Sequence, residues 1–392
     1  MLLTDVLAVL AAVSFGLTVW RWWVGLRFPL HRRQAPPSAL PGITLLKPLK
    51  GCDAATGECL RSWLRQEYSG PRQILFGVAE ASDPVCEVVR QLLAEFPEAD
   101  ARLLICGQRL GVNPKVSTLR QLEPHIRHDL VMISDADVKV PADFAANVIP
   151  YFSDPGVGLV NCFYRLANPS TAAMQWEAVA MNADFWTQVL QSRSLKPVDF
   201  ALGAVMTLPR ACLSEMGGFA VLSDYLADDY QLGRRIAAQN KRIELATLVA
   251  ECWDPPSGWG QVWAHQSRWA QTIRACQPVP FFFSILNNAS LWPLLLALLQ
   301  RTPPALGAAA FCLAFRVGSA WQQQSKMTQT RGHFRFWCWP PLKDILDAVM
   351  WVVALSGTQI VWRGDHYRVL AGGKLSKADK APPLRDCGCG QS

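Results

Sequence analysis

Two aspartates one residue apart, Asp135 and Asp137, follow the apolar run LVMIS at 130–134. If this run is a strand, side chains two residues apart point the same way, so both carboxylates share one face. Two like charges on one face repel each other unless a cation lies between them. A divalent ion such as Mg²⁺ or Mn²⁺ typically takes one or two carboxylates together with substrate phosphate oxygens. The alternative interpretation is that both aspartates form a turn or cap the segment that follows.

A second acidic pair, Asp228 and Asp229, lies further along the chain in LADDYQLGRR. Acidic residues favour the first turn of a helix, so this pair could be no more than a helix cap. One of the two could instead be a general base that takes the proton of an attacking hydroxyl group. Both interpretations stay open on these residues alone.

The segment GWGQVWAHQSRWAQTIR at 258–274 is basic and rich in tryptophan. At helical spacing His265, Arg268 and Trp269 fall on one face, because residues three and four apart are neighbours. Such a helix is typical of a membrane surface, where tryptophan lies at the headgroup level. An arginine beside a tryptophan could also bind a phosphate leaving group.

The elements that would hold these residues alternate between strand-like and helix-like segments. Strands are expected at 43–49, 72–80, 101–107 and 130–134, and helices at 57–66, 85–96 and 114–126. This alternation predicts βαβ units and a parallel sheet, in which a ligand lies beyond the carboxyl ends of the strands. Asp135 and Asp137 lie at such an end, as does Glu80 after the second strand. Beyond residue 140 the pattern loosens, with one long helix expected at 173–193.

Composition indicates a soluble domain with membrane attachments. The 392 residues are 51% hydrophobic and 18% charged, which is too apolar for one soluble domain and too charged for a wholly membrane-embedded chain. Residues 2–20 carry one charge, Asp5, and basic residues follow at 21, 27, 32 and 33. We therefore expect a retained anchor, with the following domain in the cytosol by the positive-inside rule.

Three apolar segments follow the part of the chain that carries these motifs, at 278–299, 305–321 and 345–362. The first is long enough to span a bilayer, the second contains Arg316, and the third is near the minimum of roughly 17 residues. If all three crossed, the basic tail would lie outside, against the charge rule. We therefore expect one of the weaker segments to be interfacial or re-entrant.

The net charge of +7 does not indicate nucleic acid, because the basic residues lie beside apolar segments. Anionic lipid headgroups and a phosphorylated substrate explain them better. The 12 cysteines include no paired CxxC sets, so ordinary thiols are expected rather than a zinc site, including Cys387 and Cys389.

The order of the motifs resembles glycosyltransferase family 21, which is family 2-like and comprises the ceramide glucosyltransferases and their bacterial hopanoid-associated relatives. The resemblance rests on LLKPLKGCD, FGVAEASDP, GVNPKVSTL, SDADVKV, ADDYQLGRR and HQSRW, in that order. It implies an α/β fold of the GT-A type, the nucleotide-diphospho-sugar transferase domain, which is Rossmann-like with a mainly parallel sheet. N-terminal and C-terminal transmembrane or interfacial helices would flank that domain. The expected divisions are an anchor at 1–28, a linker at 29–40, the cytosolic GT-A domain at 41–275, a membrane region at 276–362 and a cytosolic or flexible tail at 363–392.

The resemblance also implies a role for each candidate residue. Asp135 and Asp137 would hold uridine diphosphate through Mg²⁺ or Mn²⁺, and Asp229 would be the catalytic base, with Asp228 the second candidate. Binding of the donor would further involve Glu80, Lys115, His265, Arg268 and Trp269. Two residues depart from the family pattern: Glu80 replaces an aspartate, and His265 replaces the Gln or Arg of (Q/R)xxRW.

The implied enzyme is a membrane-bound inverting transferase that moves glucose or N-acetylglucosamine from a UDP-sugar to a lipid hydroxyl, on a hopanoid polyol or ceramide. The expected location is a bacterial inner membrane, with no nucleic-acid partner. Two alternatives remain at this stage. A polysaccharide synthase would use the same catalytic parts but needs a transmembrane tunnel, and a non-catalytic membrane scaffold would be expected to lack Asp135, Asp137 or Asp229.

Overall fold

The computed structural model describes residues 2–35, 40–330, 339–357, 359–362 and 365–377. Its centre is an eight-stranded sheet in the order β3-β2-β1-β4-β7-β6-β8-β5. The strands are β1 (Ile43–Leu49), β2 (Arg72–Val78), β3 (Ala101–Ile105), β4 (Leu130–Ser134), β5 (Val138–Lys139), β6 (Val157–Leu166), β7 (Val205–Pro209) and β8 (Arg242–Cys252). The four strands expected from the sequence are therefore present, and their ends differ from the expected ones by at most two residues.

The first half of the sheet is parallel, with β1 between β2 and β4 and β3 beyond β2. Buried parallel strands are nearly continuous apolar runs, and the burial of β1, β2 and β4 on both faces explains their composition. β7 pairs antiparallel with both β4 and β6, while β6 and β8 are parallel. The mainly parallel α/β sheet predicted from the sequence is confirmed.

Short helices connect the strands and place side chains at one edge of the sheet. These are α2 (Thr56–Leu64), α3 (Val85–Glu95), α4 (Pro114–Leu122), α5 (Phe144–Val148), α8 (Arg210–Glu215) and α9 (Asp228–Ala238). The start of α4 is fixed by Asn113, whose side-chain oxygen accepts a hydrogen bond from the amide of Val116 at 3.2 Å. Asn113 also donates to the carbonyl of Tyr225 at 2.8 Å, which ties α4 to the loop before α9.

The long helix expected at 173–193 is interrupted. It consists of α6 (Ala172–Val179), a π-helical segment η3 (Ala180–Phe185) and α7 (Trp186–Arg193). Within η3, the Asn182 side chain accepts from the amide of Leu166 at 2.8 Å and donates to the carbonyl of the same residue at 3.0 Å. Leu166 is the last residue of β6, so this segment is fixed to the end of a central strand.

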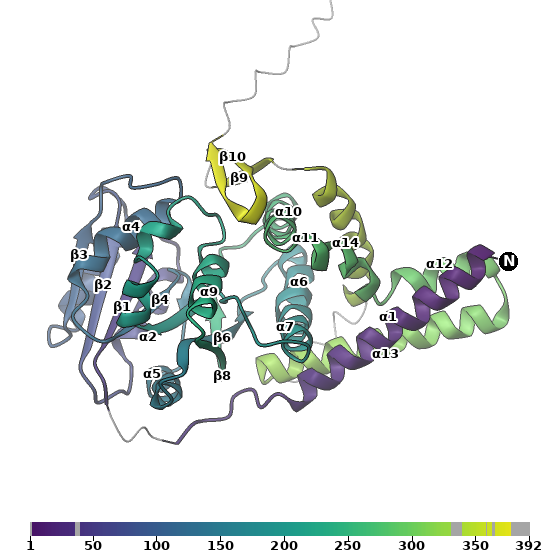
Figure 1. The fold of residues 1–392 in the computed structure, drawn as a ribbon, viewed down its shortest axis with the longest axis horizontal. Coiled ribbons are helices and arrows are strands. Elements are labelled where there is room, and N and C mark those ends of the chain that lie inside the picture. The colour runs from purple at the N-terminus through teal and green to yellow at the C-terminus, as the bar shows by residue number, and fades with distance from the viewer. Residues whose placement is uncertain (1, 36–39, 331–338, 358, 363–364, 378–392) are drawn as a thin grey trace, which may run out of the picture.

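Helices from both ends of the chain extend together away from the sheet (Figure 1). Two of them, α1 (Leu2–Arg27) and α13 (Pro303–Thr328), are long and apolar enough to cross a membrane. A third crossing is possible if α11 (Pro278–Phe283), η5 (Ser284–Asn287) and α12 (Leu291–Gln300) form one broken span, which is bent by 50°. The segment at 278–299, expected from its length to span the bilayer, is therefore broken, and Asn288 and Ser290 lie at the bend.

The last apolar segment also differs from the expected one. α14 (Trp339–Ser356) begins earlier and carries Lys343, Asp344 and Asp347, and the chain turns into β9 (Gln359–Trp362) after it. The sequence predicted a near-minimal span at 345–362, but the last four of those residues are a strand. α14 packs against α10 (Trp259–Cys276), α6 and α13 instead of standing alone.

A small antiparallel sheet follows α14, made of β9, β10 (Asp365–Val369) and β11 (Leu375–Lys377). Tyr367, Val369 and Leu375 form a separate apolar cluster that packs against Val112 and Leu226. Residues 365–377 of the expected tail therefore lie on the catalytic domain, above α10 in Figure 1. The rest of the expected tail, with Cys387 and Cys389, and part of the linker lie outside the described residues.

Candidate active site

Lys115 joins the two acidic pairs that the sequence singled out. Its ammonium nitrogen lies 2.7 Å from a carboxylate oxygen of Asp135 and 3.3 Å from one of Asp228. Burial by itself lowers the pKa of Lys115, but Asp135 and Asp228 outweigh this effect and raise it above its ordinary value. Lys115 is therefore a permanent cation between the end of β4 and the start of α9.

Asp135 and Asp137 lie just past the carboxyl end of β4, as the sequence predicted. Burial and repulsion by Asp135 and Asp254 raise the pKa of Asp137 to about 7. The carboxylate of Asp137 is therefore held where its negative charge is disfavoured without a compensating cation. This is the electrostatic setting in which a bound divalent ion stabilises both carboxylates.

Lys47, to which the sequence reasoning gave no role, is the second buried cation of the site. It projects from β1 with no solvent exposure, and its ammonium group donates to the Ser134 hydroxyl at 3.2 Å and to the Asp135 carbonyl. Burial lowers its pKa to about 8, although Asp137 and Asp135 act in the opposite direction. The sequence could have pointed to Lys47, because it is the only charged residue in the predicted strand at 43–49.

Asp228 and Asp229 occupy the first turn of α9 but have different surroundings. Asp228 is buried and paired with Lys115. Asp229 accepts a hydrogen bond from the amide of Tyr230 at 2.7 Å and lies against Gly203, where an added Cβ would come within 2.9 Å of its carboxylate. Burial and repulsion by Asp228 raise the pKa of Asp229 to about 7, which suits a general base near neutral pH.

The HQSRW segment lies on α10 and is held by a buried glutamate of α6. Nδ1 of His265 is 2.7 Å from Oε1 of Glu177, and the Gln266 side chain donates to the same oxygen at 2.8 Å. The rings of His265 and Trp269 are 4.9 Å apart, so the shared helix face predicted from the spacing is present. Arg268 is partly buried on the same helix.

Asp254 links the α10 segment electrostatically to the two aspartates after β4. Burial raises the pKa of both Asp137 and Asp254, and the charge of Asp254 raises the pKa of Asp137 further. On Asp254 itself, His265 lowers the pKa and Glu177 raises it. The amide of the neighbouring Trp253 donates to the Asp137 carbonyl at 3.0 Å, which fixes this segment beside the site. Sequence reasoning missed both Asp254 and Glu177, although Asp254 lies just past the end of β8, with only Trp253 between them.

Glu80 is exposed just beyond the end of β2. The nearby Asp83 accepts hydrogen bonds from the amide of Gly51 at 3.0 and 2.9 Å, and so joins the loops after β1 and β2. Gly51 has a φ of 67°, a conformation that favours glycine. Asp83 was not identified from the sequence, and it shapes the edge at which Glu80 lies.

Among the described residues, no group of three or more His, Cys, Asp or Glu side chains is arranged to hold a metal ion. Asp135 and Asp137 carry oxygen atoms of the kind that Mg²⁺ or Mn²⁺ takes, and the two could hold such an ion together with phosphate oxygens of a substrate. The raised pKa of Asp137 agrees with such a site, because a cation would relieve the repulsion that raises it.

This sheet, with carboxylates gathered beyond β4 and at the start of α9, defines a glycosyltransferase fold of the GT-A class. A mannosyltransferase from Pyrobaculum calidifontis has a similar fold, with a TM-score of 0.53 and 21% identity over 90% of this chain and 99% of that chain. The sequence model of glycosyl transferase family 21 matches residues 5–375, and the chain belongs to this family. The fold class and the family resemblance are therefore confirmed.

Curated relatives include lipid glycosyltransferases. Ceramide glucosyltransferase 3 of Caenorhabditis elegans is 24% identical over 255 residues, which cover 63% of this chain and 55% of that protein. The β-monoglucosyldiacylglycerol synthase of Trichormus variabilis is 22% identical over 302 residues, which cover 71% of this chain and 63% of that protein. The chain thus matches 55% to 63% of the length of these two relatives.

Proposed function

We propose that this chain transfers a hexose, glucose or N-acetylglucosamine, from a UDP-sugar to the hydroxyl group of a membrane lipid with inversion at the anomeric carbon. The observation that carries the proposal is Lys115, which joins Asp135 on the donor side to Asp228 beside the candidate base Asp229. This contact brings together motifs that lie far apart in the sequence. It forms one site in which a leaving diphosphate and an attacking hydroxyl could meet.

On the donor side, Asp135 and Asp137 would hold Mg²⁺ or Mn²⁺ together with the diphosphate. The related mannosyltransferase was solved with GDP-mannose and Mn²⁺, which supports a metal and a sugar nucleotide of some kind. When bound, the ion would offset negative charge on the departing diphosphate. Lys47, Lys115 and Arg268 would add positive charge to the same region, and Glu80 would contact the nucleoside at the exposed edge.

On the acceptor side, Asp229 would take the proton of the lipid hydroxyl as its oxygen bonds to the anomeric carbon. The bond between that carbon and the diphosphate oxygen breaks, and its electron pair leaves with UDP. Attack from the face opposite the leaving group inverts the anomeric carbon, so no covalent enzyme intermediate is needed. Trp269, near His265 and Phe185, would form one wall of the acceptor pocket.

α10, which carries His265, Arg268 and Trp269, packs against α11 of the broken span, and this suits an acceptor presented at the bilayer surface. Basic residues in the last turns of α1 and just after it, at 21, 27, 32 and 33, support a cytosolic side for the catalytic domain by the positive-inside rule. The acceptors named in the relatives, ceramide and diacylglycerol, join the hopanoid polyol as candidates. We propose the inner membrane of a bacterium as the location.

The direct test is transfer by the purified full chain from labelled UDP-glucose or UDP-N-acetylglucosamine, with Mn²⁺. Ceramide, diacylglycerol and bacteriohopanetetrol are offered separately, and the products are analysed by mass spectrometry and anomeric NMR. The expected product is a lipid that carries one hexose with inverted configuration. A polymer would indicate a polysaccharide synthase, and no donor turnover with any acceptor would indicate a non-catalytic scaffold.

The assignment of Asp229 predicts the pH dependence of the reaction. Because its pKa is raised to about 7, it is protonated below this pH and cannot accept a proton, so kcat/KM should rise through pH 7. The charged groups that act on it are Asp228, Lys115 and Asp135. Asp228→Asn removes a repelling carboxylate and should move the midpoint of the rise to lower pH. A wild-type midpoint near the ordinary carboxyl value of 3.8 would contradict the assignment.

Replacing Glu177 is expected to lower kcat/KM by a smaller factor, because Glu177 holds His265 in position. Glu177→Gln weakens the contact with Nδ1 and should lower kcat/KM about tenfold, since small misplacements of binding groups reduce rate strongly. Steady-state kinetics at saturating donor measure this change. Glu95→Gln is the matched control, because Glu95 is also ion-paired but is exposed on α3. Equal losses in the two variants would show that Glu177 has no particular role.

A further inference from the structure

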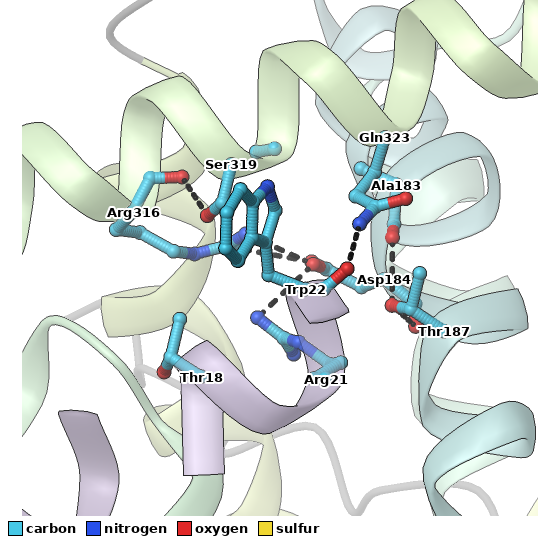
Figure 2. Close-up of a pocket in the computed structure, with 10 residues that line it drawn as sticks. Thr18, Arg21, Trp22, Ala183, Asp184, Thr187, Arg316, Ser319 and Gln323 are labelled. Atoms are coloured by element: carbon cyan, nitrogen blue, oxygen red, sulfur yellow. Dashed lines mark hydrogen bonds and ion pairs between the residues drawn. The ribbon is translucent and has the colours of Figure 1, made fainter. Parts of the chain in front are cut away.

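A buried network of charges joins the candidate membrane helices to the catalytic domain. Arg316, on α13, is 1% exposed, and its guanidinium donates to both carboxylate oxygens of Asp184 at 2.9 and 2.8 Å. It also reaches Asp344 of α14 at 2.8 to 3.2 Å. Figure 2 shows the Asp184 carboxylate between Arg316 and Arg21 of α1, which is 3.5 Å away. One aspartate of the catalytic domain thus holds two helices that can cross a membrane.

The same network reaches the bend before α12. The Ser290 hydroxyl donates to the Asp344 carboxylate at 2.6 Å, and the Asn288 amide donates to the Asp344 carbonyl at 2.6 Å. The two residues that interrupt the expected span at 278–299 are therefore bound to the helix that carries Asp344. Among the described helices, α1, α13, α14 and the start of α12 are thus joined through Arg316, Asp184 and Asp344.

Stability alone does not account for so many buried charges. Replacing a buried ion pair by apolar residues of similar size is often neutral or stabilising, because desolvation offsets most of the attraction. Ionisable residues within membrane segments are costly and usually functional. The fork of an arginine holds two carboxylates in one fixed geometry, which a more flexible lysine cannot do.

The other side of the helix that carries Asp184 contacts the candidate active site. Phe185, the next residue, has its ring 6.1 Å from Trp269 and 5.4 Å from Tyr164. Glu177, earlier on the same helix, binds His265 and Gln266. The π-helical turn η3 makes this possible by adding a residue to the helical repeat, and such turns occur often at functional sites.

We propose that the Arg316 network is a positioning device for the lipid acceptor: it fixes the membrane helices against η3 and thereby sets Phe185 and Trp269 relative to the bilayer. This inference rests on the proposed lipid transfer. Arg316, Asp184 and Asp344 are positioning residues and do not touch the reacting atoms. The network should matter for an acceptor embedded in a bilayer and not for one that diffuses freely to the site.

The test compares Arg316→Lys with the wild-type chain, using one acceptor in two forms. Lysine keeps the charge but loses the two-sided contact, so kcat/KM for a long-chain acceptor in a nanodisc should fall about 10- to 100-fold. Transfer to a short-chain form of that acceptor in detergent, and the Kd for the UDP-sugar, should stay unchanged. Hydrogen exchange within Ala180–Phe185 and Pro303–Thr328, the two segments that Arg316 joins, should become faster in the variant.

A second variant is used in case Arg316→Lys does not fold. It replaces Arg21 and Arg316 by Met and Asp184 and Asp344 by Leu, so that none of these four charges is left alone in the interior. The same selective loss is expected from it. Arg27→Lys is the control, because Arg27 lies at the end of α1 over the Trp23 ring, outside the network.

Each outcome bears on the proposal. Equal losses with both forms of the acceptor would overturn the positioning role, because they would show general damage to the protein. An unchanged rate in the nanodisc would overturn it too, and the network would be an anchor only. If wild-type protein transfers sugar to no lipid, the proposed function itself fails and this role fails with it, a result that is seen without any variant.

Discussion

Asp229→Asn is expected to lower kcat by about 10²- to 10⁴-fold while the Kd for the UDP-sugar stays close to the wild-type value. Asparagine has nearly the same shape and still accepts the hydrogen bond from the Tyr230 amide, but it cannot take a proton. The contact with Gly203 is also kept, so the backbone should not move. Single-turnover kinetics and donor calorimetry on the same preparation measure the two quantities.

Asp228→Asn is the informative comparison, because the two aspartates are neighbours in the first turn of α9. Asp228 is paired with Lys115, so its loss should disturb donor binding as well as rate. Asp199→Asn serves as the control, since Asp199 is ion-paired with Lys196 and Arg234 away from the cluster. If Asp228→Asn abolished turnover and Asp229→Asn did not, the base would be Asp228.

Asp137→Ala is expected to weaken metal-dependent binding of the donor by at least about 10- to 100-fold, the loss that even an indirect ligand contact causes when removed. Titration calorimetry with the UDP-sugar and Mn²⁺ measures this loss. Chelation of the metal should bring wild-type affinity down to that of the variant and leave the variant unchanged. Equal affinity in the two proteins with Mn²⁺ present would refute the metal role.

The thermal stability of the same variant separates this role from a structural one. Burial and repulsion by Asp135 disfavour the charge of Asp137, so its removal should not lower the Tm of the metal-free protein. A large fall in Tm would mean that the side chain supports the fold. A residue in a functional site often destabilises the protein without its ligand and stabilises the complex once the ligand is bound.

The sequence by itself determined the parallel half of the sheet. β1, β2 and β4 are buried on both faces, so they are nearly continuous apolar runs, and their expected ends agree with the structure to within two residues. The order of the motifs also predicted the family, since Glu80, Asp135, Asp229 and Trp269 each stand in a recognisable segment. The strands and the family could be predicted because each is encoded in short, continuous stretches of the sequence.

Only the tertiary structure decided which of these segments meet and which side chains complete them. Lys47, Glu177 and Asp254 take their importance from partners that are distant in the sequence. The pattern of apolar residues reports how deeply a segment is buried and not which other segment covers it. For the same reason the sequence showed Arg316 only as a weakness in a membrane span. The role of Arg316 depends on Asp184 and Asp344, which the fold brings into contact with its guanidinium group.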